Sequence, residues 1–514
     1  MRLSKLIILH SAVAFLFSQQ AFSQEAVVKK EEAVVPQEQE KSFPAFSFHG
    51  RYFLHYNYTE EFPLDETGFK DGLKTVIDHR LRIKPKAEFS ENFLIFSEAD
   101  LITGQLAGDT TDVGSDALLL PRDDYYGRKK VEFRQLYLQW KSDFGLLRAG
   151  QMTSQWGLGV MSNSGEDKED EFYDTRMGDL VDRIIFVSKP LKAFSDSEFA
   201  DSFYLALGGD VVYRDDNANL LGGDLAYEGV LSMFYDKAGL FAGAYFAYRN
   251  QKDDNGDKLW ALASDIFAKY RLNLSGDVDL NLALEGVFLY GWTDRAQFER
   301  AKDGLDILAY GFVGRAGLDL KKINFTAGLE LGFASGDGDT GDDTMRTFTF
   351  DYDYKVGMIL FEEVLGRMTA RSTDRVSDPN LVGKPIKGYE LAASDGTVSN
   401  AIYLYPRIKY SPLKNLTLTG AFLWARAVAP VADPYNSSVN GGYPAAFFGS
   451  KSGRKELGYE VNFGASYGIP IADLVTIRFA AQGGVFMPSN VFNDANGNKM
   501  DEVYKVRFLT DILW

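Results

Sequence analysis

Hydrophobic and polar residues alternate along most of this chain with a period of two. In the last eleven residues Tyr504, Val506, Phe508, Ile512 and Trp514 share one face, and Lys505, Arg507 and Asp511 share the other. Side chains of a β-strand point to opposite faces in turn, so this segment is a strand with one apolar and one charged face. Soluble chains seldom end on such a strand because their termini fray in water. The pattern is typical of the closing strand of a transmembrane barrel.

The same period recurs from residue 44 onward in segments longer than soluble strands usually are. Many reach the length that a tilted membrane strand needs. The pattern predicts eighteen strands, an even number as a single-chain bacterial barrel requires. They cover residues 44–59, 75–89, 92–106, 130–142, 145–152, 182–189, 201–213, 224–236, 239–250, 258–273, 277–292, 305–320, 322–334, 400–410, 415–428, 454–469, 474–487 and 501–514.

The connections between these strands alternate in length. Most of those after even-numbered strands are tight turns, with 190–200 as the exception, whereas those after odd-numbered strands are long and acidic. Short periplasmic turns and long extracellular loops are typical of outer-membrane barrels. We therefore predict an all-β fold, a transmembrane antiparallel up-and-down β-barrel over residues 44–514, whose last strand pairs with residues 44–59. A soluble all-β protein also alternates, but it explains neither the strand lengths nor the loop alternation.

The N-terminal region predicts export from the cytoplasm. Arg2 and Lys5 precede an apolar run, and Ala21-Phe22-Ser23 is a small-residue cleavage pattern, so residues 1–23 are expected to be a secretory signal peptide. Residues 24–43 are rich in Glu, Gln and Lys and are expected to form a flexible periplasmic tail. The chain has no cysteine, so disulfides and thiolate metal sites are excluded. Together with the barrel pattern, these features predict the outer membrane of a Gram-negative bacterium.

Six segments resemble a known group of proteins: RQLYLQW (134–140), RAGQMTSQWGLG (148–159), DRIIF (182–186), LGFASGDGD (331–339), KELGYEVNFGASY (455–467) and GGVFMPSN (483–490). The chain resembles an uncharacterised outer-membrane barrel family of the delta-proteobacterial type and, more distantly, the alginate-export porin superfamily. This resemblance implies eighteen strands and a basic lumen. It also implies that the terminal residues Tyr504, Val506, Phe508, Ile512 and Trp514 are the signal that the barrel-assembly machinery recognises.

If the apolar faces contact lipid, the charged residues of the strands line the pore. The predicted basic lining residues are Arg51, Arg80, Arg82, Lys84, Lys86, Arg134, Arg148, Lys269, Arg271, Arg315, Arg407, Lys409, Arg478, Lys505 and Arg507. The predicted acidic ones are Asp78, Glu88, Asp265, Asp279, Glu285, Asp319, Glu330, Glu456, Glu460 and Asp511. A basic excess favours anionic solutes. Alternatively, these charges pair across neighbouring strands and keep the wall rigid and hydrated.

Loop 335–399 is the longest connection, and residues 357–372 within it have apolar side chains near helical spacing. We expect it to fold into the pore as a constriction, since an eighteen-strand lumen is wide; an extracellular cap is the alternative. The acidic turns at 253–257, 335–343 and 494–498 could hold calcium but lack the twelve-residue spacing with a terminal Glu. No cofactor is expected.

Other function classes receive little support. The formal charge of −17, or −19 once Arg2 and Lys5 leave with the signal peptide, disfavours nucleic acid as a partner. Only His49, His55 and His79 follow the predicted cleavage site, and no serine stands in a nucleophile-elbow motif, so we do not expect an enzyme. The sequence predicts a porin-like channel for passive diffusion of small hydrophilic solutes with a mild anion preference. Export of an anionic polysaccharide, or a non-conducting adhesin or structural barrel, remain alternatives.

Overall fold

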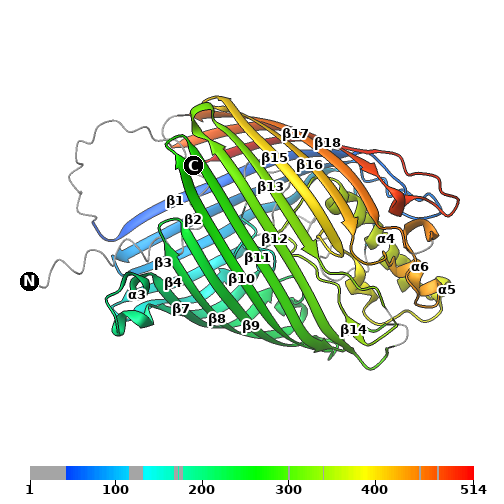
Figure 1. The fold of residues 1–514 in the computed structure, drawn as a ribbon, viewed down its shortest axis with the longest axis horizontal. Helices are drawn as coiled ribbons and strands as arrows, with labels where there is room; N and C mark the ends of the chain where they lie inside the picture. The colour runs from blue at the N-terminus through cyan, green and yellow to red at the C-terminus, as the bar shows by residue number, and fades with distance from the viewer. Residues whose placement is uncertain are drawn as a thin grey trace, which may run out of the picture.

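The computed structural model describes residues 42–114, 131–166, 172, 178–298, 301–339, 341–450, 453–471 and 474–514. Eighteen long strands form one antiparallel sheet in which each strand pairs with its neighbours in sequence order, and β1 pairs with β19 to close a barrel. One further strand, β14, has only two residues and pairs parallel to β12, so it is not part of the barrel wall. Residues 42 and 514, the two termini of the described chain, lie at one end of the barrel and the helices α4, α5 and α6 at the other (Figure 1). The eighteen-strand antiparallel barrel predicted from the sequence is confirmed.

The strands are β1 Ala45–Thr59, β2 Thr75–Ser90, β3 Phe93–Gly108, β4 Glu132–Ser142, β5 Gly145–Thr153, β6 Leu180–Ser188, β7 Phe203–Arg214, β8 Leu225–Lys237, β9 Leu240–Lys252, β10 Lys258–Ser275, β11 Val278–Thr293, β12 Leu305–Leu320, β13 Phe325–Ala334, β14 Thr344–Met345, β15 Ala401–Leu413, β16 Leu416–Ala427, β17 Glu456–Ile471, β18 Val475–Pro488 and β19 Val503–Leu513. Each long strand begins and ends within three residues of its predicted position. The period-two pattern was therefore sufficient to locate them.

In the described part of the chain, helices occur only in the connections between strands. They are α3 Glu198–Ser202, α4 Gly366–Ser377, α5 Pro379–Val382 and α6 Pro434–Val439, with a π-helical turn at Leu360–Leu365 before α4 and short 3₁₀ turns at Pro190–Ala193, Leu220–Gly222, Lys321–Ile323, Tyr389–Ala392, Phe447–Gly449 and Asn490–Phe492. None of the helices in the described part of the chain is long and apolar enough to cross a membrane. The longer turn at 190–200 contains α3 and lies at the same end as the termini (Figure 1).

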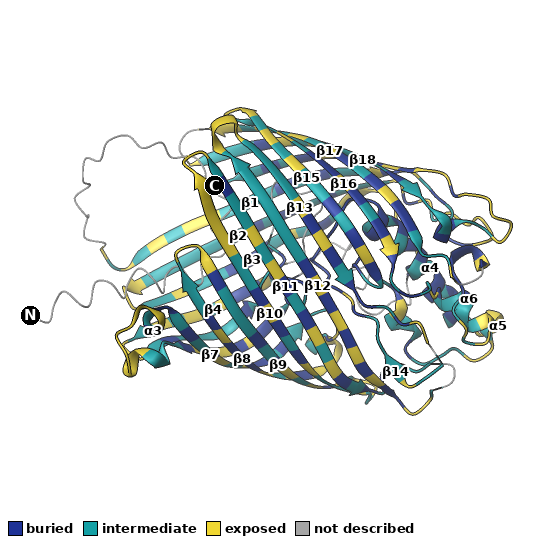
Figure 2. Cartoon of the chain, in the orientation of Figure 1, coloured by how far each residue is buried: buried dark blue, intermediate teal, exposed yellow. Residues whose placement is uncertain are grey.

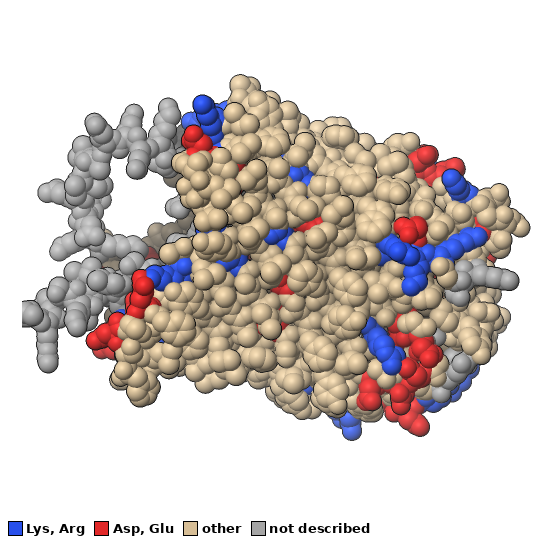
Figure 3. All heavy atoms as spheres, viewed as in Figure 1, with Lys and Arg blue, Asp and Glu red and all other residues tan. Residues whose placement is uncertain are grey.

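The outer surface of the barrel is apolar. Along each strand exposed residues alternate with buried ones (Figure 2), and the exposed set includes Ile184 at 63%, Ile266 at 67% and Phe463 at 66%. The face shown in Figure 3 carries few charged side chains between its two ends, while many gather at the end that bears the long loops. A soluble barrel would place these large apolar residues inside, so this surface suits contact with hydrocarbon.

The seam of the barrel joins residues from the two ends of the chain. β1 and β19 pair from Arg51 opposite Leu513 to Thr59 opposite Lys505, which confirms the predicted partner of the last strand. Beyond β19, the amide of Trp514 donates to the carbonyl of Gly50 at 3.1 Å, and the amide of Gly50 donates to the carbonyl of Trp514 at 3.0 Å. A Cβ atom on Gly50 would lie 2.2 Å from the Trp514 indole ring, so only glycine allows this close approach.

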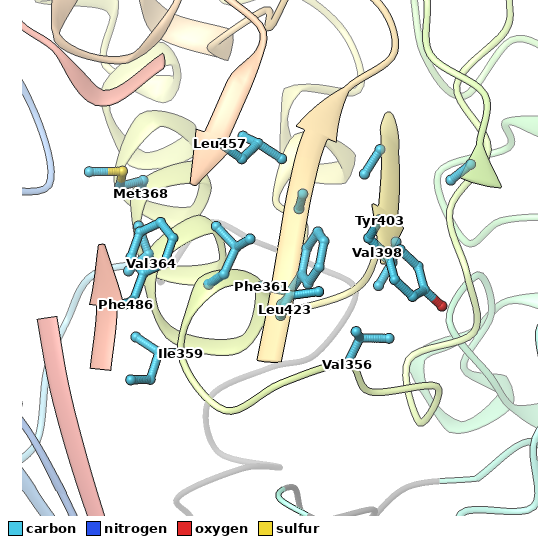
Figure 4. Packing of buried hydrophobic residues seen from close by; sticks show 14 of the residues in the cluster. Val356, Ile359, Phe361, Val364, Met368, Val398, Tyr403, Leu423, Leu457 and Phe486 are labelled. Atoms are coloured by element: carbon cyan, nitrogen blue, oxygen red, sulfur yellow. The ribbon is translucent and has the colours of Figure 1, made fainter. Parts of the chain in front are cut away.

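Inside the barrel, apolar side chains of the connections pack against the inner wall. The largest buried cluster joins residues 348–368 to β15, β16 and β18, and Figure 4 shows Ile359, Phe361 and Val364 among Tyr403, Leu423 and Phe486. A second cluster places Trp156 on Phe234, Phe241 and Tyr245 of β8 and β9. The interior therefore contains two segments that are not part of the wall, 154–166 and 348–365.

Candidate functional site

The inner wall is basic where β1, β18 and β19 meet. The carboxylate of Asp511 accepts hydrogen bonds from Arg51 at 2.7 Å and from Arg478 at 2.7 Å. His55 Nε2 lies 3.4 Å from the same carboxylate. Two guanidinium groups thus contact one carboxylate, and Asp511 is the one acidic residue of these three strands.

A second charged group covers the inner faces of β2, β3 and β4. Glu98 is fully buried and lies 2.8 Å from Arg134 Nε and 3.0 Å from Lys84 Nζ. Arg82 forms a two-point contact with Asp100, at 2.7 and 3.0 Å. Glu166 lies 2.8 Å from Lys84, so three acids face three bases in this group, as the alternative of charge pairing across strands expects.

Two further arginines of the wall bind neutral groups. Arg148 on β5 donates to the amide oxygen of Gln139 at 2.8 Å and stacks on Tyr137. Arg507 on β19 donates to Asn57 at 2.9 Å and to the carbonyl oxygen of Phe172 at 3.2 Å. These contacts are to neutral groups, because amides and carbonyls carry no charge.

The segment 154–166 is fixed to the wall by two carboxyl groups. The amides of Leu158 and Val160 donate to Glu285 on β11, the latter at 2.9 Å. Trp156 Nε1 donates to Asp265 on β10 at 3.1 Å. Both acids are 0% exposed, so their role in this structure is to hold the loop.

The segment 348–365 is fixed in the same way by Glu460 on β17. This carboxylate accepts the amides of Met358 at 2.5 Å, Ile359 at 3.2 Å and Leu360 at 2.8 Å. These amides begin the π-helical turn and have no partner within it, so the carboxylate satisfies donors that would otherwise be lost. The predicted helical spacing at 357–372 corresponds to this turn and α4. Residues 348–365 of loop 335–399 therefore lie inside the barrel, and a constriction of the pore by this loop stays a prediction.

Glu330 on β13 joins the wall to the same loop. It accepts hydrogen bonds from the hydroxyls of Tyr354 and Tyr403 at 2.9 and 2.7 Å. Arg315 and Arg407 lie 2.7 and 3.2 Å from its other oxygen. Four donors therefore contact this one buried carboxylate.

The structure corrects the prediction for Glu456. It forms an ion pair at 3.1 Å with Arg426, which lies on the outward face of β16. A bulge causes the change, because Ala425 pairs with Gly458 and Arg426 pairs with Glu456, leaving Leu457 as an extra residue. Leu457 turns inward and is 3% exposed. One inserted residue moves the preceding side chain to the other face.

The remaining predicted lining residues differ in their surroundings. Lys86 pairs with Glu88 at 3.3 Å, and exposed Arg271 and Lys321 pair with Asp279, all at the end of the barrel that holds the termini. Asp78 accepts a hydrogen bond from Asn57, and Asp319 accepts hydrogen bonds from Asn281 and Thr326.

Lys505 contacts Glu363 of the folded loop at 2.5 Å. Arg80 lies over Phe53 and Lys269 over Phe241, and Lys409 follows the inward alternation of β15.

Several inward charges were missed by the sequence analysis. They are Glu98, Asp100, Arg183, Asp210, Glu228 and Arg249. Arg183 and Asp210 face one another across β6 and β7 with two contacts at 2.7 and 2.6 Å. Each of these residues lies in a segment that was predicted as a strand, so the same alternation could have shown that its side chain points inward.

The histidines do not come together. His49 is exposed near the termini, whereas His55 is 2% exposed and stacks on Phe53 at 4.1 Å. The carboxylates of the candidate calcium turns are engaged locally, as when Asp494 accepts the amides of Asn496 and Asn498. In the described ranges no group of three or more His, Asp or Glu is arranged to hold a metal ion. Calcium binding stays untested.

Comparison with known proteins supports the fold. No protein-family model and no curated protein sequence matches the chain. The structure is similar to that of Pseudomonas aeruginosa OpdK with vanillate, with a TM-score of 0.52, 12% identity, and 91% of this chain and 98% of that chain covered. A second structure of P. aeruginosa OccK1 (OpdK) gives a TM-score of 0.51, 11% identity and the same coverage. At this identity the likeness establishes a shared barrel fold.

Proposed function

We propose that this protein is an outer-membrane channel through which small hydrophilic solutes diffuse, with a mild preference for anions. The observation that carries the proposal is a closed barrel with an apolar outer surface and a charged inner wall. The apolar outer face of such a barrel contacts lipid and its polar inner face contacts water, which is the arrangement of a hydrated pore. Membrane lipids, the barrel-assembly machinery and the solutes are the partners that this function needs.

The anion preference rests on the wall formed by β1, β5, β18 and β19. On the inward faces of these strands the basic residues Arg51, Arg148, Arg478, Lys505 and Arg507 stand beside one acidic residue, Asp511. An excess of fixed positive charge raises the local concentration of anions. The balanced groups around Glu98 and Asp100 reduce this effect, so we expect the preference to be mild.

Small solutes fit the interior better than a polymer does. The segments 154–166 and 348–365 both occupy the lumen and are held there by buried carboxyl groups. Export of a long anionic polysaccharide would need a continuous basic track, and Glu98, Asp100 and Asp511 interrupt it. The resemblance to alginate exporters therefore concerns the fold and does not support a polysaccharide substrate. Because OpdK was solved with vanillate, small aromatic carboxylates are reasonable first solutes to test.

A planar bilayer experiment tests both parts of the proposal. The purified barrel should give open-channel steps, and its reversal potential in a potassium chloride gradient should lie toward the chloride equilibrium potential. Arg148→Gln should move this potential toward zero, since one fixed charge is lost while the hydrogen-bonding side chain stays polar. Arg426→Gln, on the outer face of β16, is the matched control and should leave selectivity unchanged.

The outcomes separate the alternatives. Absence of any open-state current would contradict a channel and favour an adhesin or structural barrel. Cation selectivity in the unmodified protein would contradict the anion preference while leaving the channel intact.

A further inference from the structure

The connection between β6 and β7, residues 189–202, is the longest one at the end of the barrel that holds the termini of the described chain. We call it the foot. It contains the 3₁₀ turn Pro190–Ala193 and helix α3, and it lies at the rim of the barrel (Figure 1). Two of its side chains are large, apolar and exposed, Phe194 at 88% and Phe199 at 56%. Burying such side chains is favourable, so two of them in one short segment indicate a surface that meets a partner.

The foot is folded by its own polar contacts. The hydroxyl of Ser197 caps α3 and accepts the amide of Ala200 at 3.3 Å. The carboxylate of Asp201 accepts hydrogen bonds from Lys189 at 3.2 Å and from Lys192 at 2.8 Å, so it joins the 3₁₀ turn to α3. The two phenylalanines are therefore carried by a segment with a definite fold.

Phe199 continues the outer apolar surface of the barrel wall. Its ring stacks on those of Phe203 on β7 and Tyr235 on β8, with ring centroids 5.9 and 5.5 Å apart. Phe203 and Tyr235 are opposite each other in the register of β7 and β8. By alternation they share the outward face with Leu207, which is 55% exposed. The foot therefore extends the face that meets lipid beyond the ends of these strands.

The position of Tyr235 places the foot at the level of a membrane interface. Tyr227 and Tyr235 lie on the outward face of β8, eight residues apart. At a rise of about 3.4 Å per residue and a tilt of about 40°, they are about 21 Å apart along the barrel axis. The apolar band of an outer-membrane barrel is about 25 Å tall and ends in a girdle of aromatic side chains on each side. Tyr235 and the stacked Phe199 therefore belong to the girdle at the end that bears the foot.

The foot also follows the lowest part of the wall. β5 and β6 have nine residues each, whereas β10, β11 and β12 have 18, 16 and 16. Nine residues at the same rise and tilt span about 23 Å, slightly less than the apolar band. A membrane protein must compensate for a wall that is too short for the bilayer. Phe194 and Phe199 add apolar surface directly after β6, and Phe144, in the turn between β4 and β5, is 85% exposed at the same end.

The charges of the foot do not favour a charged partner. Lys189 and Lys192 both contact Asp201, and Lys237 of β8 contacts Glu198. These basic side chains are thus paired with acids of the foot itself. What the foot exposes is aromatic, which fits the boundary between lipid headgroups and acyl chains, where aromatic side chains concentrate.

We propose that the foot is a membrane anchor, which inserts Phe194 and Phe199 between the phospholipids of the periplasmic leaflet and holds the low side of the wall in the bilayer. The anchor goes beyond the proposed channel, because contact with lipid does not require conduction. Since its exposed side chains are apolar and its lysines are paired, vesicles of phosphatidylcholine alone should be sufficient for insertion.

Quenching by brominated lipids tests the anchor, because the chain has no cysteine of its own and accepts a single label. Phe194→Cys, Gly276→Cys and Ile266→Cys are each labelled with bimane and folded into phosphatidylcholine vesicles. Gly276 lies in the tight turn after β10 at the same end of the barrel, and a Cβ atom there meets open space. Ile266 lies in the middle of β10 on the outer face and marks full contact with lipid.

The label at 194 should be quenched at least about twofold more than the label at 276 by lipids brominated near the headgroup end of the chain, as a side chain at the interface would be. Iodide in the water should quench the label at 276 more strongly. Equal quenching of the two labels by both reagents would overturn the anchor. Excimer formation by pyrene at residue 194 would overturn it as well, because a second copy of the chain would then cover the phenylalanines.

A stability measurement provides an independent readout. In urea titrations from the same vesicles, Phe194→Ser should lower the ratio of folded to unfolded protein by about tenfold, the effect expected when one large apolar side chain loses its contact with lipid. Leu221→Ser is the matched control, because Leu221 is 78% exposed in the turn Leu220–Gly222 at the opposite end of the wall. Equal effects of the two substitutions would contradict insertion of Phe194.

Discussion

At the scale of single residues, the carboxylates inside this barrel do two different things. Some pair with arginines of the wall, as Asp511 does with Arg51 and Arg478. Others accept main-chain amides of the inserted loops, as Glu285 and Glu460 do. The alternation of a strand shows that all of them point inward but not which of these roles each one has. The role depends on what lies opposite in the lumen.

Glu460 offers a sharp test of the second role. Glu460→Ala should leave the amides of 358–360 buried without a partner, a loss of about 1–3 kcal/mol for each unsatisfied group. We expect loop 335–399 to become susceptible to added protease while the barrel stays folded in detergent gels. Glu456→Ala, on the same strand but on the outer face, is the matched control. Equal protease resistance in the two variants would show that Glu460 does not hold the loop.

At the scale of elements, the seam between β1 and β19 depends on a few terminal residues. Trp514 exchanges two backbone hydrogen bonds with Gly50 and covers it with its ring. The outward face of β19 carries Tyr504, Val506 and Phe508, each more than a third exposed. Their role as an assembly signal is still a prediction.

Removing Trp514 should impair assembly rather than conduction. We expect less folded barrel in outer-membrane fractions, but unchanged single-channel conductance for the molecules that do insert. Gly50→Val should reduce folding as well, because its Cβ would clash with the indole ring. Normal membrane insertion of the chain without Trp514 would contradict the assignment.

One contact between two loops depends on pH. Arg375 of α4 donates to Glu66 of the first loop and lowers the pKa of that carboxyl. A depressed pKa stabilises the contact above the ordinary value of 4.5, and the stabilisation is lost as the pH falls through the lowered pKa. Below about pH 4 we therefore expect faster amide exchange in residues 62–72, measured by mass spectrometry, and Glu66→Gln should remove this acid response.

At the scale of the whole molecule, the fold is inside-out relative to a soluble protein. Ile266, in the middle of β10, is 67% exposed, while its neighbours Asp265 and Phe267 are almost fully buried. The likeness to OpdK, at TM-scores just above 0.5, indicates the same architecture. An apolar belt of this kind is stable only when hydrocarbon covers it.

Ile266→Arg tests that belt. In lipid vesicles it should lower the free energy of unfolding by about 2–4 kcal/mol, the cost of placing arginine near the bilayer midplane. Ile266→Leu should be close to neutral, because it conserves volume and polarity. Urea titrations in vesicles measure both, and an equally small effect of the arginine would argue that this face does not contact lipid.

The sequence by itself determined the strands, their number, the two faces of the wall and the pairing of the last strand with the first. All of these follow from a local period of two and from connection lengths, which need no knowledge of distant residues. The bulge at Leu457 was missed because one extra residue interrupts that period without any sign in composition.

Only the tertiary structure decided what fills the lumen. Glu285 meets Leu158, and Asp351 meets Asn163, although these residues are more than a hundred positions apart in the chain. A loop has no fixed periodicity, so its course depends on where buried amides can find acceptors. The sequence therefore specified the wall of the barrel, and the packing of the loops against it decided which charges remain open to the pore.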